Sequence, residues 1–289
     1  MQSLWMLLAS FLFAVMASTV KLASPDLGTF TMVAWRGLFG VVLLGGWSFA
    51  RGRSMKTDYF SSHMARSGAG TLALAMWMYA LAYLPLSTGT TLNYTSPLWM
   101  ALLLSIAALI KGERIEYKLI AVCLVGFAGV VQVLQPEFRA SDALPAALGL
   151  ASGLLSAVAY IQIKQLSNLK EPEWRVVFYF SLFNLVFGVT GHLLFEEPDV
   201  YTVRSALCAV GCGLSATIAQ IAMTRSYGSG NLLVSSILSF SGIVFASLIG
   251  ITVFDDPVQL TTYLGIALII AAGVAASVLT KKPRAPKSP

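Results

Sequence analysis

Residues 67–110 read SGAGTLALAMWMYALAYLPLSTGTTLNYTSPLWMALLLSIAALI, and these 44 residues include no charged side chain. A helix that crosses a bilayer needs about 20 apolar residues. The stretch is therefore long enough to cross twice, with a tight turn near residues 84–90. A chain that crosses the membrane, turns and crosses back is a polytopic membrane protein.

The whole chain has the composition of such a protein. Of its 289 residues, 57% are hydrophobic and 11% are charged, and the mean hydropathy is +0.77. A soluble domain carries about 25% charged residues. Segments of membrane-spanning size take up nearly the whole length, so we expect no soluble catalytic domain.

Charges and turn residues divide the chain into ten apolar passes. Within hydrocarbon only helices and closed barrels satisfy the backbone, and long runs without polar alternation predict helices. We therefore expect an all-α membrane protein with ten transmembrane helices. The expected passes are residues 4–20, 30–49, 68–85, 90–110, 119–134, 143–163, 176–195, 205–224, 231–254 and 261–279.

The basic residues set the expected orientation. Fifteen of the 19 Lys and Arg fall in the termini or in loops after even-numbered passes, whereas Lys21, Arg139 and Arg204 fall on the other side. By the positive-inside rule, both termini are expected in the cytoplasm, with the protein in the inner or plasma membrane. The net charge of +6 is then explained by orientation rather than by nucleic-acid binding. The first pass lacks the basic start of a secretory signal, so we expect it to stay as a helix.

The two halves of the chain show weak similarity to each other. At a shift of about 144 residues, residues 128–130 align with 272–274, both reading AGV, and Tyr83 aligns with Tyr227. Chance matches between apolar sequences are the alternative explanation. Because each half holds five passes, an odd number, a second copy would enter the membrane from the opposite side. The pattern therefore predicts two inverted five-helix repeats, which is a transporter architecture.

This division gives the expected domains. Residues 1–137 form the first five-helix repeat and residues 138–280 the second. Residues 281–289 form a basic cytoplasmic tail.

Arg36 is the one charged side chain deep inside an apolar run, because every Asp and Glu falls between the runs. An ionisable residue within the membrane is a functional candidate, yet no carboxylate is available in the runs to pair with it. Its partners would be carbonyls, hydroxyls, water or a substrate anion. We expect a structural or gating role for Arg36, and direct contact with substrate is the alternative.

Pro97 lies inside the fourth pass and cannot donate to the carbonyl of Asn93, so we expect a kink there. A polar cavity or neighbouring helices must satisfy such a defect, which makes Asn93, Tyr94 and Pro97 candidates for lining a substrate site. In the ninth pass, a segment rich in serine and glycine is the corresponding weak point, with Ser239 as a lining candidate and Gly242 as a structural or gating candidate. A kink that serves only helix packing is the alternative.

Aromatic and polar side chains deep in other passes complete the expected substrate site. Tyr79 and Tyr83 are four residues apart and share one helix face. Trp99 would add apolar area, and Tyr160 and Gln220 would place polar groups in the sixth and eighth passes. Together these residues predict a cavity for an amphipathic solute with few fixed charges. Aromatic residues also collect at membrane interfaces, and Tyr83 lies near the outer surface.

Cysteine and histidine suggest no catalytic or metal chemistry. Cys208 and Cys212 are one helical turn apart, but their pass holds no His or acid, so we interpret them as small packing residues. His63 is expected in a cytoplasmic loop and His192 near the outer end of the seventh pass, both at interfaces. We expect no catalytic residue, metal or cofactor.

Several segments together carry a resemblance to a known family. They are NYTSPLW at residues 93–99, KGER at 111–114, AWRGL at 34–38, AMTRSY at 222–227 and SFSGIVFAS at 239–247. With them the chain resembles the drug/metabolite transporter superfamily, and within it the ten-helix EamA-type exporters, which include aromatic amino-acid exporters. The resemblance covers about residues 4–280.

This resemblance implies a secondary transporter that exports small metabolites by alternating access around a central apolar cavity. Amino acids, aromatic or large neutral ones, are the implied substrates. The sequence departs from the family pattern in the ninth helix, which lacks the frequent proline and ends in Asp255, Asp256 and Pro257 rather than Gly-Glu. The motifs are loose, so they identify the fold better than the substrate.

Other functions are alternatives to amino-acid export. A multidrug exporter or an exporter of nucleosides or other metabolites is the main alternative, and a channel is a further one. An intramembrane enzyme would need paired aspartates, a Ser-His arrangement or a zinc motif, none of which the passes contain. Because no Asp, Glu or His sits at mid-membrane, we expect a facilitator, or coupling through Tyr, Arg36 or backbone groups. The expected partners are a small-molecule substrate and the lipid bilayer, not nucleic acid, and a monomer is compatible with the sequence.

Overall fold

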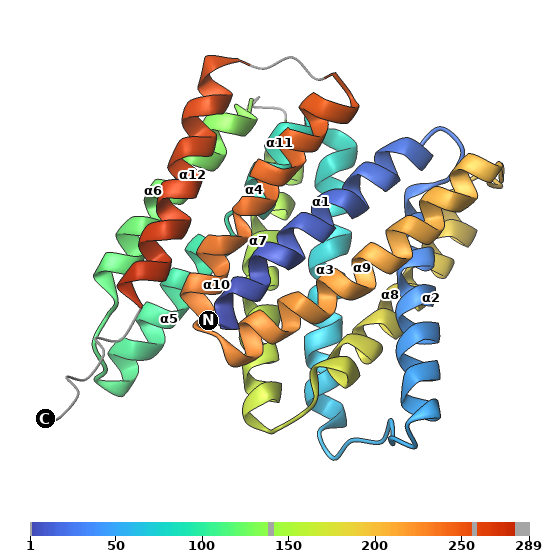
Figure 1. Cartoon of the computed structure of the whole chain (residues 1–289), viewed down its shortest axis with the longest axis horizontal. Coiled ribbons are helices and arrows are strands. Elements are labelled where there is room, and N and C mark those ends of the chain that lie inside the picture. Colours follow the sequence, from blue (N-terminus) through green and yellow to red (C-terminus); the bar gives the residue numbers. More distant parts are fainter. Residues whose placement is uncertain (1, 138–141, 256–258, 281–289) are drawn as a thin grey trace, which may run out of the picture.

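The protein is a bundle of long helices, shown in Figure 1 as a computed structural model that describes residues 2–137, 142–255 and 259–280. Every regular element among these residues is helical. The elements are the short 3-10 helix η1 (Gln2–Leu4) and the α-helices α1 (Trp5–Ala23), α2 (Thr29–Ala50), α3 (Phe60–Tyr83), α4 (Leu86–Asn93), α5 (Ser96–Lys111), α6 (Tyr117–Leu134), α7 (Ala143–Asn168), α8 (Glu173–Phe195), α9 (Val203–Ser229), α10 (Leu232–Ser239), α11 (Ser241–Val253) and α12 (Leu260–Leu279).

The prediction of an all-α membrane protein is confirmed. The ten expected passes correspond to ten helical segments, if α4 with α5 and α10 with α11 each count as one pass. Nine helical segments among the described residues are long and apolar enough to cross a membrane. The tenth pass is α3, which is less apolar. Arg139, the dipeptide of Asp256 and Pro257, and the predicted basic tail lie outside the described residues.

Helix α3 corrects one predicted boundary. It begins at Phe60 rather than at residue 68, so that His63 lies in its first turn and not in a loop. The side chain of His63 is fully buried. The sequence pattern placed the boundary too late because polar residues occupy the first two turns of this helix, and three of them, His63, Arg66 and Ser67, are buried. His192 lies in the last turn of α8, as predicted.

Four close helix pairs organise the bundle: α2 with α8, α1 with α9, α3 with α7, and α6 with α12. In the order of the passes, these are pass 2 with 7, 1 with 8, 3 with 6 and 5 with 10. Replacing each pass by its equivalent in the other half, five passes away, gives the same four pairs. In the α6–α12 pair, Gly129 and Gly265 bring the two backbones together. A methyl group on either glycine would lie 2.7 Å or less from the carbonyl oxygen of the other. The two inverted repeats remain a prediction, and a pairing of this kind is what a two-fold relation between halves requires.

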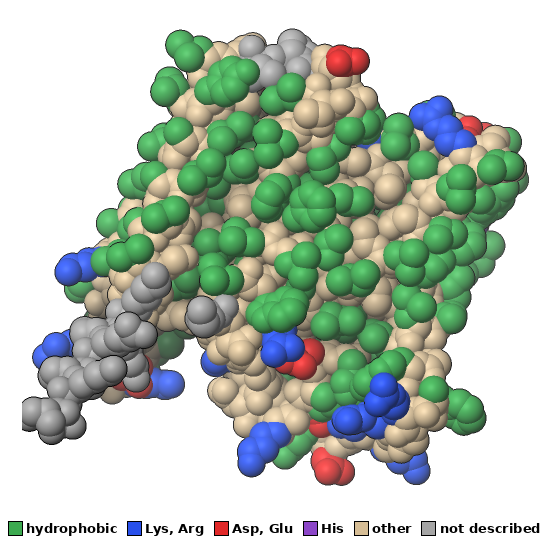
Figure 2. Space-filling view, viewed as in Figure 1, with side chains coloured by type: hydrophobic (Ala, Val, Ile, Leu, Met, Phe, Trp, Pro, Cys, Tyr) green, Lys and Arg blue, Asp and Glu red, His purple; other side chains and the backbone are tan. Residues whose placement is uncertain are grey.

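The surface is apolar around the middle of the bundle and charged toward its ends. Figure 2 shows hydrophobic side chains across the middle of the visible face, with Lys, Arg, Asp and Glu side chains gathered toward its two ends. Large apolar side chains stay exposed on the outside, for example Leu193 at 75% and Leu207 at 67%. Such a belt suits contact with lipid. Following the predicted orientation, we call the end where α2 leads into α3, at the bottom of Figure 1, the inner end, and the opposite end the outer end.

Candidate functional site

Two passes are interrupted near the middle of the bundle. A turn at Tyr94 and Thr95 separates α4 from α5, and a turn at Phe240 separates α10 from α11. Both interruptions lie where the sequence predicted weak points. The predicted cause needs a correction in the fourth pass. Pro97 is the second residue of α5, where its missing N–H would have no helical partner anyway, so the break comes before the proline rather than at it.

Side chains at the two interruptions contact neighbouring helices. Asn93 donates a hydrogen bond from Nδ2 to Oγ of Ser152 in α7, at 3.1 Å. Ser239 donates to the carbonyl oxygen of Ser236 within its own helix. A methyl group on Gly242 would lie 2.8 Å from the hydroxyl oxygen of Tyr94, so the missing side chain of this glycine leaves space for the tyrosine hydroxyl. The two interruptions therefore meet through Tyr94 and Gly242, which lie 148 residues apart in the sequence.

Tyr160 of α7 lies at the centre of a set of polar aromatic groups. Its ring stacks on that of Tyr227 in α9, with centroids 4.4 Å apart and planes 12° apart. The Tyr160 phenol also lies close to the Tyr94 phenol and to the Arg36 guanidinium. Ser236 donates to the hydroxyl of Tyr227 at 3.4 Å. The structure thus brings the predicted residues Tyr94, Tyr160 and Arg36 into one region, and adds Tyr227, which the sequence analysis had used only as a repeat match.

Arg36 reaches into the bundle rather than outward to the membrane surface. Its Nη2 donates to Oε1 of Gln220 at 3.2 Å, and Gln220 lies well inside α9. Its guanidinium carbon lies 5.6 Å from the centroid of the Phe180 ring in α8. Two predicted site residues, Arg36 and Gln220, are therefore joined by a hydrogen bond.

The sequence analysis missed a buried arginine, Arg66, because it considered only charges inside the apolar runs. Arg66 lies in the second turn of α3, and only 1% of its surface is exposed. Its guanidinium carbon lies 3.9 Å from the centroid of the same Phe180 ring. The sequence signal was concealed because Arg66 precedes the apolar run by one residue and therefore resembles a loop cation.

The remaining predicted lining residues lie elsewhere. The rings of Tyr79 and Tyr83 are 4.7 Å apart, which confirms that they share a face, and 39% and 63% of these residues is exposed. Trp99 packs against the main hydrophobic core, and its indole N–H is buried without a hydrogen-bond partner among the described residues. Pro97 is buried in the first turn of α5.

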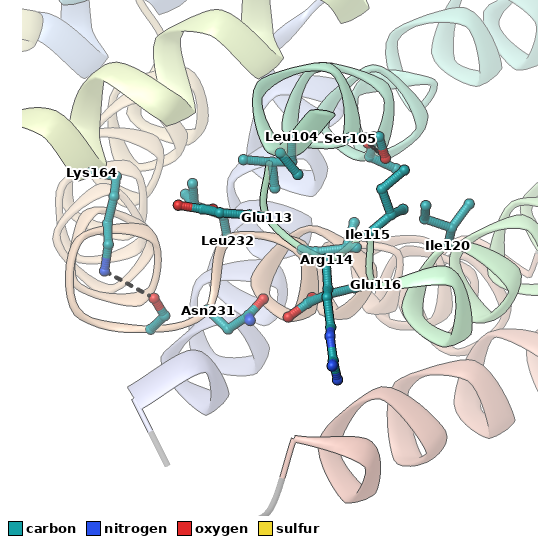
Figure 3. A pocket seen from close by; sticks show the side chains of 14 residues that line it. Leu104, Ser105, Glu113, Arg114, Ile115, Glu116, Ile120, Lys164, Asn231 and Leu232 are labelled. Carbon is teal, nitrogen blue, oxygen red and sulfur yellow. Dashed lines mark hydrogen bonds between the residues drawn. The ribbon is translucent and has the colours of Figure 1, made fainter. Parts of the chain in front are cut away.

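A pocket of about 370 Å³ opens at the inner end, between the loop after α5 and the start of α10. In Figure 3, Lys164 lies on one side of it and Ser105 and Ile120 on the other, while Arg114 points away. Lys164 donates to the carbonyl oxygens of Gly228 and Gly230 at the end of α9, at 2.8 and 3.2 Å. The volume lies in the range of small-ligand sites. None of the predicted site residues lines this pocket.

An ion-pair cluster ties two loops together at the inner end. Glu171 accepts hydrogen bonds from Nη1 of Arg175 at 2.9 and 3.0 Å and from the hydroxyl of Thr57 at 2.9 Å, and it pairs with Nε2 of His63 at 3.1 Å. Arg175 also donates from Nη2 to the carbonyl oxygen of Ser54. Burial alone would raise the pKa of Glu171, but the hydrogen bonds from Arg175, His63 and Thr57 outweigh it, so this pKa lies below its ordinary value.

Two carboxylates cap a helix at the outer end. Glu196 accepts from the backbone N–H groups of Phe30 and Thr31 at 2.7 and 3.1 Å, and Asp199 accepts from that of Gly28 at 2.9 Å. The hydroxyl of Thr31 donates to Oδ2 of Asp199 at 2.7 Å. Negative charge at the first turn of α2 is favourable because the N–H groups there are unpaired and the helix dipole is positive.

The described residues hold no group of three or more His, Cys, Asp or Glu side chains that could bind a metal ion. Cys123, Cys208 and Cys212 are free thiols.

The fold and the site together define a class of protein. Helices of membrane-spanning length surround a polar centre at which two of them are interrupted, and interrupted helices at mid-membrane are typical of secondary transporters. Comparisons with known proteins agree. The model of the EamA-like transporter family matches residues 1–135. By these matches the chain is similar to EamA-type proteins of the drug/metabolite transporter superfamily.

Individual relatives cover most of the chain. A pseudopaline exporter of Pseudomonas aeruginosa is 28% identical over 95% of both chains. A riboflavin transporter of Vibrio cholerae is 27% identical over 78% of this chain and 75% of its own. A crystal structure of a protein that is 20% identical superimposes with a TM-score of 0.85, covering 96% of this chain and 99% of that one, which supports the fold. The family and these named relatives are transporters, in agreement with the prediction that the chain is not an enzyme.

Proposed function

We propose that the chain exports a small metabolite from the cytoplasm by alternating access, with residues 1–137 and 138–280 moving against each other as inverted repeats. The observation that carries this proposal is the contact between the two interrupted passes through Tyr94 and Gly242. The four close helix pairs are the same when each pass is replaced by its equivalent in the other half, and this supports a two-fold relation between the halves. Both termini face the cytoplasm in this proposal, and the inner or plasma membrane holds the protein.

The direction and the substrate class rest on similarity. The pseudopaline exporter matches over nearly the full length of both chains, which supports export. We propose amino acids or closely related metabolites as substrates, with an aromatic or large apolar body. The stacked pair of Tyr160 and Tyr227 and the ring of Phe180 supply flat apolar surface for such a body.

In this proposal the substrate lies beside Tyr160, between the two interruptions. Arg36, Asn93, Tyr94, Gln220 and Ser239 are grouped there or on the adjoining turns, whereas Trp99 and Pro97 support the interrupted fourth pass from the core side. The pocket beside Lys164 is the entrance from the cytoplasm. The Tyr79 and Tyr83 pair lies on the outer part of α3, and there it would meet the substrate on its way out.

Coupling to protons has no obvious carrier. The described helices hold one acidic residue, Glu173 at the first position of α8, and two histidines, His63 and His192, which pair with Glu171 and Glu196 toward the two ends of the bundle. Membrane carriers that move protons commonly use a carboxylate or histidine inside the membrane. A facilitator is therefore the mechanism that this arrangement favours.

Transport by the purified chain in liposomes tests the proposal. The panel holds large neutral amino acids, nucleosides, riboflavin and cationic drugs, each measured with and without a proton gradient. Saturable flux of amino acids without a gradient is the expected result. Movement of drugs alone, driven by the gradient, would contradict the substrate class and favour multidrug export.

A matched pair of variants ties the flux to the interruptions. Gly242→Val places atoms where the Tyr94 hydroxyl lies and should abolish transport. Gly46→Val, in α2, meets no atom within 4 Å and should leave transport unchanged. Equal flux from both variants would separate the interruptions from the transport path.

A further inference from the structure

Two arginines converge on one aromatic ring inside the bundle. The guanidinium carbons of Arg66 and Arg36 lie 3.9 and 5.6 Å from the centroid of the Phe180 ring. They come from α3 and α2, and the ring comes from α8. Tyr160 of α7 lies close to both arginines. Four helices thus bring two positive charges to the place where the substrate is proposed to bind.

No carboxylate compensates these charges among the described residues of the interior. Glu173, the one acidic residue within the described helices, stands at the first position of α8. Glu171 pairs with His63, one turn before Arg66, but its oxygens are engaged by Arg175, Thr57 and that histidine. Two like charges in a poorly hydrated interior repel each other and lack solvation. An arrangement of this kind is favourable only when an anion is present.

The buried groups without partners around the arginines are mostly hydrogen-bond donors. Nε and Nη1 of Arg66 and Nε2 of Gln220 are buried and have no partner among the described residues. The hydroxyl of Thr224, one turn from Gln220 on the same face of α9, is in the same state. Buried polar groups are nearly always hydrogen-bonded in proteins. A ligand that satisfies this set must offer acceptors, and a carboxylate or phosphate group offers several.

We propose that the transported substrate is an organic anion, whose carboxylate or phosphate group binds between Arg36 and Arg66 while its apolar body rests against the rings of Phe180 and Tyr160. The planar guanidinium forms paired hydrogen bonds with such groups and also stacks on aromatic faces. This inference rests on the proposed function and narrows it, because a zwitterionic amino acid neutralises the site less well than a molecule with net negative charge.

The charge of the substrate also explains why the described residues place no acidic proton carrier at mid-membrane. A cytoplasm that is electrically negative drives anions outward, so an exporter of anions needs no coupled ion to work in that direction. The site then only has to bind the anion and release it to the outside, because the membrane potential supplies the driving force.

The test uses the full chain in liposomes and four probes with one shared ring: N-acetyl-L-phenylalanine and phenyl phosphate as anions, L-phenylalanine as zwitterion and L-phenylalaninamide as cation. Flux is measured by mass spectrometry of the vesicle contents, under potassium diffusion potentials of both signs. Binding is measured separately by thermal stabilisation of the purified protein. We expect the anions to bind and move best, with uptake faster into vesicles whose interior is positive. Whether N-acetylphenylalanine or phenyl phosphate is preferred identifies the anionic group.

Variants connect the effect to the two arginines. Arg66→Gln and Arg36→Gln should each raise the half-saturating concentration of the anions about tenfold to a hundredfold, the effect of losing a hydrogen bond to a charged group. They should leave binding of phenylalaninamide unchanged or improved. Arg66→Lys, which keeps the charge but loses the planar group, should be intermediate. Arg53→Gln is the control, because Arg53 also lies over an aromatic ring, that of Trp47, but is exposed.

The outcomes separate this inference from the proposed function. If phenylalanine binds and is transported while the two anionic probes neither bind nor move, the inference is overturned and the transporter proposal stands. Anion binding that depends on Arg36 and Arg66, without flux of any probe, would support the anion site and contradict transport. If Arg66→Gln does not fold, Arg36→Gln and the probe series on the unchanged protein decide the question, and anion affinity equal to that of phenylalaninamide overturns the inference.

Discussion

Arg175 and Arg66 are two arginines in different surroundings. At the inner end, Arg175 donates to both oxygens of Glu171 and to the carbonyl of Ser54. In the interior, Arg66 is more deeply buried, yet two of its N–H-bearing nitrogens have no partner among the described residues, and its closest described contact is the face of Phe180. The protein therefore places its carboxylates at the ends of the bundle.

This difference separates charges that stabilise the fold from charges that can bind a ligand. The charges at the inner end connect the loop after α2 with the loop after α7, and those at the outer end cap α2, so both sets stabilise the packing of helices. In the interior, Arg36 donates one hydrogen bond, to the neutral side chain of Gln220, and Nε and Nη1 of Arg66 have no hydrogen-bond partner among the described residues. A buried charge whose N–H groups lack partners in the fold can bind a ligand through those groups, and the predictions below test that separation.

The largest expected effect comes from Arg66→Met. It removes an unpaired buried charge and keeps a long apolar side chain, so the melting temperature should stay the same or rise. Apparent affinity for anions should fall about a hundredfold, or about 3 kcal/mol. Thermal melting in detergent and transport in liposomes measure the two quantities. A variant that melts much earlier but transports normally would place Arg66 among the structural charges.

Glu171→Gln should have the opposite profile. It leaves Arg175 and His63 without a negatively charged partner in an almost buried cluster, so the free energy of unfolding should drop by about 2 kcal/mol. Affinity for substrate should change little. Asp58→Asn, an exposed acid in the neighbouring loop, is the control for loss of charge. Equal melting of both variants would show that the inner-end cluster is not a structural bond.

The contribution of Glu171 should depend on pH. Because its pKa in the folded protein lies below the ordinary value of 4.5, the stabilisation is fully present above pH 4.5 and is lost as the pH falls through the folded value. The gap in melting temperature between the unchanged protein and Glu171→Gln should therefore shrink below pH 4.5. A gap that is constant from pH 6 to pH 3.5 would contradict the assignment.

The smallest effect is expected from Gly70→Ala in α3. The added methyl group would lie 3.0 Å from the Phe180 ring and 3.4 Å from Nη1 of Arg66, so it should shift the site and weaken anion binding by about threefold, or about 0.7 kcal/mol. Gly68→Ala, two residues earlier, meets no atom within 4 Å and serves as the control. Both variants gain helix propensity, so only binding should distinguish them.

Much of the fold follows from sequence alone, because the length of an apolar run fixes a membrane pass. The runs gave ten passes, and most of their boundaries lie within a few residues of the observed helices. The exception, the start of α3, shows the limit of hydropathy. His63 and Arg66 are buried by contacts with the α7–α8 loop and with α8, and a hydropathy pattern does not contain those contacts.

The site was predicted in part for similar reasons. Arg36 was found because it interrupts an apolar run, and the weak points of the fourth and ninth passes were found from proline, serine and glycine. The bond between Arg36 and Gln220 and the contact between Tyr94 and Gly242 join distant segments of the chain. Such contacts depend on how helices are rotated against each other, which no local pattern specifies.

The interruptions divide their two passes unequally. Helices α4 and α10 have eight residues each, and in Figure 1 they lie toward opposite ends of the bundle, α4 in the upper half and α10 in the lower half. Each is about 12 Å long, at 1.5 Å per residue. As a rigid lever hinged at the interruption, such a helix swings its free end by about 3 Å when it turns by about 15°. Each end of the molecule thus holds one of the two short half-helices, and a tilt of that half-helix alone would change the shape of its own end of the bundle.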